Sequence, residues 1–423
     1  MKHTVENSKT LLVDGPSSVT LLSGESKVLG APINVEERFV IREGKRIPFE
    51  VVEKSTFDLV LGENTPFEEI EGSTIPSSWE NVSEELICGG KLLTVMVVGD
   101  VDSGKTSFCT YLANKALEKK LKVAIIDADL GQSDVGPPAT ISFSCITTPV
   151  KDLFEVDAES AYFIGLTSPS RVTEDVIEKL SSLKGMALKN DLNLLIVNTD
   201  GWVDGEEAIA YKIQSVEKTA PDIVVGIQRE NELAPILTAL KGRKVFSVDS
   251  PSVIRARDRE KRKILRELSY KKYLKDAKIQ SFPLNWINVE GAFFKTKNHP
   301  AESLRKIRAM LETYPVYFEE TPTSVFLVLK KGQWIDEDLV KKIESEHGKR
   351  AKIIREDDEE GLLVAFQDSD GGFLGIGVIR SIDYERLVMK VYTSVYKNVA
   401  SILVGQMKLD EKGREIGISP VFL

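Results

Sequence analysis

The chain has 423 residues, of which 42% are apolar and 29% are charged, and its formal net charge is −9. This composition is typical of a soluble globular protein with two or three domains, and it argues against a disordered or fibrous chain. No apolar run approaches the ~20 residues of a membrane span, and the N-terminus lacks the apolar core of a signal peptide. We therefore expect a cytoplasmic protein without a membrane partner.

The rarest residues narrow the chemistry further. The three cysteines form no CxxC pair, which argues against a disulfide framework or a zinc site. The three histidines are scattered through polar surroundings, so any general base is expected to be a carboxylate. The negative net charge argues against coating nucleic acid by bulk attraction, but it leaves room for a local basic patch.

The pattern of apolar and polar residues changes twice along the chain, which predicts three domains in an α/β protein. Residues 1–88 contain short alternating runs separated by glycines, as in a small β-sandwich. Residues 89–285 alternate near-continuous apolar runs with helical patterns, which predicts a doubly wound, mainly parallel sheet. Residues 286–423 mix helical and strand patterns and are expected to form an α+β domain.

The stretch VMVVGDVDSGKTSFCTYL contains the complete G-x4-G-K-[ST] pattern between a strand-like run and a helix-like run. Glycines let successive N–H groups converge on phosphate oxygens at a helix N-terminus, and the lysine reaches the β- and γ-phosphates. The alternative is a tight turn without a ligand. We predict a nucleoside triphosphate site at Gly99, Asp100, Val101, Asp102, Ser103, Gly104, Lys105, Thr106 and Ser107, with the Thr106 hydroxyl binding Mg²⁺.

A second strand-like run ends in DADLGQ, where Asp127 and Asp129 alternate and Gln132 follows. The carboxyl edge of a parallel sheet is where a P-loop protein places its second carboxylate. One aspartate could support the Mg²⁺ shell, and the other could face an incoming nucleophile. Alternatively, Asp127 only caps a turn. No NKxD guanine-reading signature is present.

Two further stretches could contact a nucleic acid. In NTDGW, Thr199 and Trp202 follow a strand-like run, and the tryptophan could stack on a base or pack under a loop. Residues 255–278 hold 11 Lys and Arg against 4 Asp and Glu, a net charge of +7. Such a run is commonly a solvated helix face, but after a P-loop domain it could be a lid that brings arginines onto phosphates.

Together these stretches resemble the polynucleotide 5′-hydroxyl kinase family, the P-loop RNA kinases of mRNA 3′-end formation, tRNA splicing and ribosomal RNA processing, in an archaeal-type form. The likeness rests on GDVDSGKT, DxDxGQ, TxGW and an arginine-rich lid, which occur in the family's order and cover most of the chain. It implies transfer of the γ-phosphate of ATP, with Mg²⁺ or another divalent cation, to the 5′-OH of RNA, with DNA as an alternative acceptor. RNA-processing proteins are possible partners.

The resemblance also implies roles for single residues. Asp129 would be the general base on the 5′-OH, and Asp127 would join Thr106 at the metal. Lys105, Arg262 and Arg266 would stabilise the transferring phosphoryl group. Gln132, Thr199, Trp202 and Arg257 would contact the substrate. Lys45 and Arg46 are candidates for a basic residue that the family's N-terminal domain supplies near the adenine.

Two other functions remain open at this point. A non-catalytic ATP-binding scaffold in an RNA-processing complex would keep the P-loop but need no base or lid. An unrelated P-loop NTPase switch would need neither TxGW nor a basic lid. Both therefore explain fewer of these residues than a kinase does.

Overall fold

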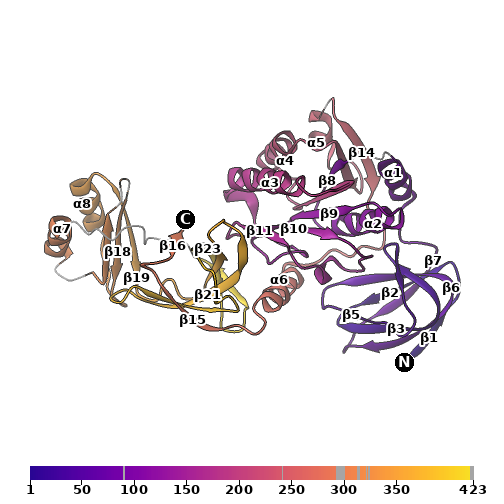
Figure 1. Cartoon of the computed structure of the whole chain (residues 1–423), viewed down its shortest axis with the longest axis horizontal. Helices are drawn as coiled ribbons and strands as arrows, with labels where there is room; N and C mark the ends of the chain where they lie inside the picture. Colours follow the sequence, from indigo (N-terminus) through magenta and orange to yellow (C-terminus); the bar gives the residue numbers. More distant parts are fainter. Residues whose placement is uncertain are drawn as a thin grey trace. The chain divides into compact units, whose positions relative to one another are not determined.

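The computed structural model describes residues 1–88, 91–240, 242–291, 301–311, 315–320, 322 and 324–419. The chain divides into two compact units, Met1–Ser269 and Tyr270–Leu423, and many of their elements are labelled in Figure 1. Within the described residues, no helix combines the length and the apolar character needed to cross a membrane.

The first unit begins with a seven-stranded antiparallel sheet. Its strands are β1 (Lys2–Val5), β2 (Lys9–Asp14), β3 (Ser17–Val28), β4 (Ala31–Ile33), β5 (Arg38–Ile41), β6 (Arg46–Leu61) and β7 (Phe67–Glu71). The two long strands, β3 and β6, pair with different partners at their two ends, and shifts of register interrupt their own pairing. Such irregularities bend strands, and the bent sheet encloses one apolar core.

The same unit contains the expected mainly parallel sheet. Its strands are β8 (Leu93–Gly99), β9 (Val123–Ala128), β10 (Thr140–Ile146), β11 (Ser160–Phe163), β12 (Leu194–Thr199), β13 (Ile223–Gln228) and β14 (Lys244–Asp249), in the order β11-β10-β9-β12-β8-β13-β14. The strands β9, β12, β8, β13 and β14 are parallel to one another. Strands β10 and β11 extend the sheet beyond β9 with antiparallel pairing. The carboxyl ends of β8, β9 and β12 therefore meet at one edge.

Helices cover both faces of this sheet (Figure 1). They are α1 (Ser77–Ile87), α2 (Lys105–Glu118), α3 (Thr173–Ala187), α4 (Glu206–Thr219) and α5 (Ala234–Ala239). Alternate residues of β8 face opposite layers: Val95 and Val97 pack with α1 and α2, whereas Met96 and Val98 pack with α3, α4 and α5. Burial on both faces explains the continuous apolar runs of the sequence.

Helix α1 corrects the first expected domain boundary. The expected β domain ends at residue 88, but α1 packs in the core of the parallel sheet rather than in that of the N-terminal sheet. Trp79 is fully buried, and its indole N–H donates a hydrogen bond to the carbonyl oxygen of Asp249 at the end of β14 (2.8 Å). The β domain therefore ends with β7, and α1 belongs to the P-loop domain.

The second unit has a mixed sheet with the order β15-β22-β21-β20-β23-β16 and a smaller three-stranded sheet, β17-β18-β19. The strands are β15 (Lys278–Pro283), β16 (Asn288–Glu290), β17 (Tyr317–Glu320), β18 (Ser324–Leu329), β19 (Arg350–Arg355), β20 (Leu362–Gln367), β21 (Phe373–Asp383), β22 (Val388–Thr393), β23 (Ser401–Leu409) and β24 (Glu415–Ile418). The helices α7 (Ala301–Leu311) and α8 (Glu337–His347) share an apolar core with the small sheet. This is the α+β character that the sequence predicts.

Strand β15 corrects the second expected boundary. It pairs antiparallel with β22 along its whole length, so residues 278–283 belong to the C-terminal sheet. The expected boundary after residue 285 is therefore too late. The basic run 255–278 contains the helix α6 (Arg259–Tyr273), and the first compact unit ends within this helix, at Ser269.

Candidate active site

One cavity of about 950 Å³ lies within the first unit, at the edge where β8, β9 and β12 end. Its walls come from the N-terminal sheet, the P-loop, the loops after β9 and β12, and the start of α6. Of the residues that the sequence predicts, the lining includes Asp100, Val101, Asp102, Gly104, Lys105, Thr106, Ser107, Asp129, Gln132, Trp202, Arg257, Arg262 and Arg266. The structure thus brings residues of all four predicted stretches, the P-loop, DADLGQ, NTDGW and the basic run, to one cavity.

The P-loop joins the end of β8 to the start of α2. Gly104 has a φ of +101°, a conformation that residues with side chains rarely adopt. A Cβ atom at Gly99 would lie 2.7 Å from the carbonyl oxygen of Ile227, so glycine is also required where the strand ends. Ser103 is fully buried within the loop.

Lys105 is the first residue of α2 and is 5% exposed. Its ammonium donates a hydrogen bond to the carbonyl oxygen of Asp100 (2.7 Å). Burial lowers the pKa of Lys105, and the neighbouring carboxylate of Asp129 opposes that shift. The loop therefore holds a cation beside a carboxylate at the cavity wall.

Asp127 organises the loop after β9 from beneath. One carboxylate oxygen accepts from the Asn198 side-chain amide (3.0 Å), and the other accepts from the backbone N–H groups of Asp134 (2.8 Å) and Val135 (3.2 Å). The side chain is fully buried. Burial, followed by the nearby carboxylates of Asp129 and Asp134, raises the pKa of Asp127 to about 7.

Asp129 and Gln132 follow Asp127 in the same loop, and both line the cavity. One Asp129 oxygen accepts from the backbone N–H groups of Gly131 (3.1 Å) and Gln132 (2.9 Å). Burial raises the pKa of Asp129, against the opposing effect of the Lys105 ammonium. The Gln132 amide donates to the carbonyl oxygen of Arg262 in α6 (3.1 Å), so this loop also contacts the predicted lid.

Trp202 is held by a buried network after β12. The backbone N–H of Trp202 donates to the Asp200 carboxylate (2.9 Å), which also accepts from the Tyr211 hydroxyl (2.9 Å) and pairs with the Lys212 ammonium (2.9 Å). The rings of Trp202 and Tyr211 stack with centroids 5.7 Å apart. The Trp202 side chain is half-buried, so one part of it packs on α4 while the residue lines the cavity.

Thr199 and Gly201 of the same motif serve the scaffold. Thr199 is 3% exposed, and its hydroxyl donates to the carbonyl oxygen of Val97 in β8 (2.8 Å), so the expected substrate contact of Thr199 is not what the geometry favours. A Cβ atom at Gly201 would lie 2.8 Å from the backbone nitrogen of Val101. The glycine therefore lets this loop approach the P-loop backbone.

The predicted lid is fastened to the P-loop by Asp102. This side chain is 7% exposed and accepts from the backbone N–H of Arg257 (2.8 Å). The guanidinium groups of Arg257 and Arg262 lie 3.5 and 3.7 Å from its two oxygens. Arg266, one turn further along α6, also lines the cavity.

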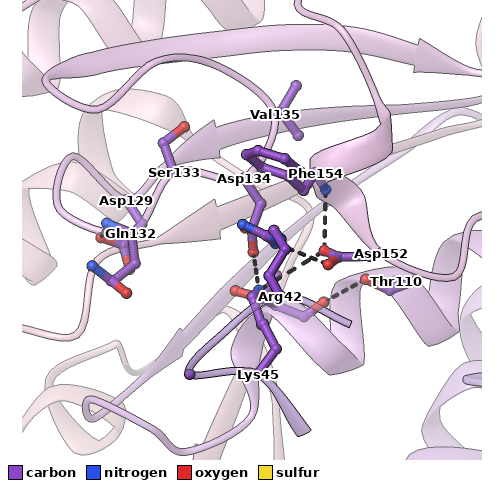
Figure 2. Close-up of polar contacts among 12 residues, drawn as sticks. Arg42, Lys45, Thr110, Asp129, Gln132, Ser133, Asp134, Val135, Asp152 and Phe154 are labelled. Atoms are coloured by element: carbon purple, nitrogen blue, oxygen red, sulfur yellow. Dashed lines mark hydrogen bonds and ion pairs between the residues drawn. The ribbon is translucent and has the colours of Figure 1, made fainter. Parts of the chain in front are cut away.

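The N-terminal sheet contributes cations to the cavity wall. Figure 2 shows Arg42 and Lys45 converging on Asp134, with contacts of 3.0 and 2.7 Å to its two oxygens. Burial alone would raise the pKa of Asp134, but Lys45 and Arg42 outweigh that effect and hold this pKa below its ordinary value. Arg46 instead pairs with Asp14 (2.6 Å) within the β domain.

Comparison with known proteins agrees with this geometry. Residues 99–276 match the family model for the P-loop of the mRNA cleavage and polyadenylation factor CLP1. This CLP1-type segment contains the P-loop, the aspartate loop, the TxGW motif and nearly all of the predicted lid.

Relatives extend the likeness beyond the CLP1-type segment. The chain is 28% identical over 338 residues to the polyribonucleotide 5′-hydroxyl-kinase of Methanocaldococcus jannaschii, covering 78% of this chain and 90% of that one. It is 28% identical over 328 residues to the enzyme of the same description from Pyrococcus abyssi, covering 77% and 90%. The Clp1p chain of a Clp1p–Pcf11p complex has the same fold, with a TM-score of 0.69, 14% identity, and coverage of 96% of this chain and 97% of that chain.

The sequence alone does not identify several residues of the CLP1-type site. Asp134 lies in the aspartate loop, and Asp200 lies inside TxGW, but no local pattern separates them from ordinary turn residues. Lys212 lies on a helix whose spacing does not reveal that its ammonium is buried. Arg42 precedes the candidates Lys45 and Arg46, and nothing local sets it apart. A signal is present only in the repeated acidic residues of DADLGQSD.

Proposed function

We propose that this chain is an ATP-dependent polynucleotide 5′-hydroxyl kinase that phosphorylates the 5′-OH end of RNA. The observation that carries the proposal is the placement of Lys105 and Asp129 in one cavity with Arg262 of the lid. A cation for the phosphates, a buried carboxylate and a second source of cations are the parts that phosphoryl transfer needs. The archaeal relatives, which are described as polyribonucleotide 5′-hydroxyl-kinases, support the same activity.

In this reaction the 5′-oxygen forms a bond to the γ-phosphorus of ATP while the bond from that phosphorus to the β-γ bridging oxygen breaks. Asp129 accepts the hydroxyl proton. Burial raises its pKa toward the range where a general base is most effective, and Lys105 keeps it from rising further. Lys105 and Arg262 stabilise negative charge on the transferred group, and ADP leaves.

Substrate recognition is assigned to the loop after β12 and to the lid. Trp202 offers a half-buried indole beside the cavity, which suits stacking on the terminal base whatever its identity. Gln132 and Arg257 line the cavity beside the lid and can bond the terminal phosphodiester. Stacking and backbone contacts of this kind would tolerate many sequences, as a kinase acting on chain ends requires.

The residues also suit Mg²⁺, which when bound would neutralise charge on the β- and γ-phosphates. The Thr106 hydroxyl lies at the cavity wall, 3.4 Å from the Asn198 amide that also contacts Asp127. Both Asp127 oxygens already accept hydrogen bonds, so Thr106 would hold the ion and Asp127 would support the site through the loop that it bonds. Mg²⁺ commonly keeps several waters in such sites.

The direct test is incubation with γ-labelled ATP and 5′-OH RNA, 5′-OH DNA or buffer alone. Label on the RNA 5′ end supports the kinase. Label only in free phosphate would favour an NTPase switch, and ATP binding without turnover would favour a non-catalytic scaffold.

Asp129→Asn separates chemistry from binding. It should lower phosphorylation by ~10²-fold or more while the ATP affinity stays within a few-fold, because the amide cannot accept the proton. If ATP binding were lost instead, Asp129 would belong to the metal shell rather than act as the base.

A further inference from the structure

The turn that joins β5 to β6 has the sequence Arg-Glu-Gly-Lys, residues 42–45. The N–H of Lys45 donates to the carbonyl oxygen of Arg42 (3.1 Å), which closes the turn. Gly44 has a φ of +80°, which favours glycine. The closed turn places the side chains of its first and last residues, Arg42 and Lys45, on the cavity wall.

These two cations occupy both oxygens of Asp134. The Arg42 guanidinium also contacts Asp152 (2.8 Å) and lies 3.7 Å from the centre of the Phe154 ring (Figure 2). All four charged side chains are at most 13% exposed. Removing one charge from such a group leaves its partner buried and uncompensated, so the arrangement is held strongly.

Asp134 belongs to the loop that carries Asp129. The loop is braced from within, because the N–H of Asp134 bonds to the Asp127 carboxylate and the N–H groups of Gly131 and Gln132 bond to Asp129. A short, internally bonded loop moves as one piece. Fixing the Asp134 side chain therefore also fixes the position of the Asp129 carboxylate in the cavity.

The same turn reaches the lid. The carbonyl oxygen of Gly44 accepts from Nε of Arg257 (3.1 Å). A Cβ atom at Gly44 would lie 3.4 Å from Cγ of Leu265, so α6 packs directly against the turn. One four-residue turn of the β domain thus touches two parts of the proposed reaction, the base-carrying loop and the lid.

We propose that the 42–45 turn is a positioning element of the phosphotransfer site, which sets the base-carrying loop through Lys45 and Arg42 and the lid through Gly44. The inference rests on the proposed kinase function. This positioning role is more than simple attachment of the β domain to the P-loop domain. Attachment alone is provided elsewhere by Lys151, which pairs with Glu37 of the β domain.

That second ion pair supplies a matched control. Glu37→Gln breaks an ion pair between the same two domains, and this pair lies outside the 129–135 loop. Lys45→Met and Asp134→Asn break the contact with the loop. The double variant Lys45→Met/Asp134→Asn completes a double-mutant cycle, which shows whether the two residues act through one shared contact.

Steady-state kinetics with ATP and 5′-OH RNA should separate the variants. Lys45→Met and Asp134→Asn should each lower kcat about 10- to 100-fold, with the ATP dissociation constant within about threefold, because a displaced base harms chemistry more than binding. The double variant should be little worse than the worse single variant. Glu37→Gln should keep kcat within about twofold. Equal losses in all variants, or multiplying losses in the double variant, would overturn the proposal.

Hydrogen–deuterium exchange of the full chain gives a readout that needs no activity. Peptides spanning 129–135 should lose about tenfold or more protection in Lys45→Met and keep it in Glu37→Gln, while peptides of β8 and β12 stay protected in both, which also establishes that the variants fold. Unchanged protection of 129–135 in Lys45→Met would contradict the positioning role. If the wild type lacked kinase activity while this exchange pattern held, only the proposed function would fail.

Discussion

The carboxylate of Asp200 and the ammonium of Lys212 form a buried ion pair, 2.9 Å apart, with side chains only 6% and 1% exposed. Lys212 also donates to the carbonyl oxygen of Asp200 (2.9 Å). The same carboxylate accepts from the backbone N–H of Trp202 and from the hydroxyl of Tyr211, whose ring stacks on the Trp202 indole. Helix α4 therefore contacts Trp202 at two points, its backbone through Asp200 and its ring through Tyr211, although Lys212 is ten residues further along the chain.

Loss of this ion pair should weaken binding of the RNA end. We expect Lys212→Met to raise the KM for 5′-OH RNA about tenfold or more, because stacking on an aromatic ring contributes about 1–3 kcal/mol per base and requires a fixed ring. It should also destabilise the fold, since Asp200 stays buried without its cation.

The matched control is Lys184→Met. Lys184 is a partly buried lysine that bonds the carbonyl oxygens of Thr219 and Ala220, at the far end of α4. Kinetics and intrinsic tryptophan fluorescence would be compared in both variants. An unchanged RNA KM in folded Lys212→Met would show that the network does not position the Trp202 indole for binding.

Lys105→Ala tests the P-loop assignment. The variant should lower phosphoryl transfer by ~10³-fold or more, because the β- and γ-phosphates lose a fixed cation in a buried site. Lys115→Ala removes a lysine further along the same helix, where it pairs with Glu118, and should leave turnover unchanged. Single-turnover rates at saturating ATP measure both. Near-wild-type transfer in Lys105→Ala would exclude this loop as the phosphate site.

Asp127 should make stability depend on pH. Its pKa is raised to about 7 in the fold, above the ordinary value near 4, so between these values the folded chain binds the proton more tightly than the unfolded chain. The stabilisation is fully present below pH 4 and is lost as the pH rises through 7. The carboxyl group should thus contribute about 2–3 kcal/mol less at pH 7.5 than at pH 5.

Asp127→Asn removes the titrating group. The difference in thermal midpoint between the wild type and this variant should therefore change steadily between pH 5 and pH 7.5, to the disadvantage of the wild type at the higher pH. A difference that stays constant across the range would mean that Asp127 does not titrate there.

Local patterns predict the parts of this protein that depend on neighbouring residues. The P-loop, the aspartate loop and the basic helix are each encoded by residues close together in the sequence, so the sequence indicates them. The family resemblance that they carry is confirmed. The strand β10 is not predicted, because its residues alternate serine with apolar side chains. Ser142 and Ser144 are buried, but in the sequence they make this segment look polar.

Contacts between distant segments are not predictable in the same way. Asp134 meets Arg42 across 92 positions of sequence, and nothing near either residue encodes the other. Thr199 is expected at the substrate because a motif gives the residue but not the direction of its hydroxyl, which bonds to Val97. The expected domain boundaries are wrong for a related reason, since Trp79 and β15 find their partners far along the chain.

The lid discriminates between a kinase and a scaffold. Arg262 lies near Asp102 of the P-loop, and Arg266 lines the cavity, so both can reach the transferring group. Arg262→Ala/Arg266→Ala should lower the transfer rate more than it weakens ATP binding. If either arginine binds the RNA backbone, the log–log salt dependence of RNA binding should also flatten, by about 0.7 of a unit for each single-strand phosphate that the variant no longer neutralises.

A control with the same change of charge comes from the same helix. Arg259 and Lys263 are exposed and lie outside the residues described as lining the cavity, so Arg259→Ala/Lys263→Ala removes two cations without touching the site. Single-turnover phosphorylation and RNA affinity across a salt series would be measured for both double variants. Equal losses in the two would mean that α6 acts only through its bulk charge. If neither variant changed the transfer rate or the salt slope, the basic run would be a solvated surface helix. A scaffold that uses ATP to hold its domains together would then be the better interpretation, because such a protein needs no cation at the γ-phosphate.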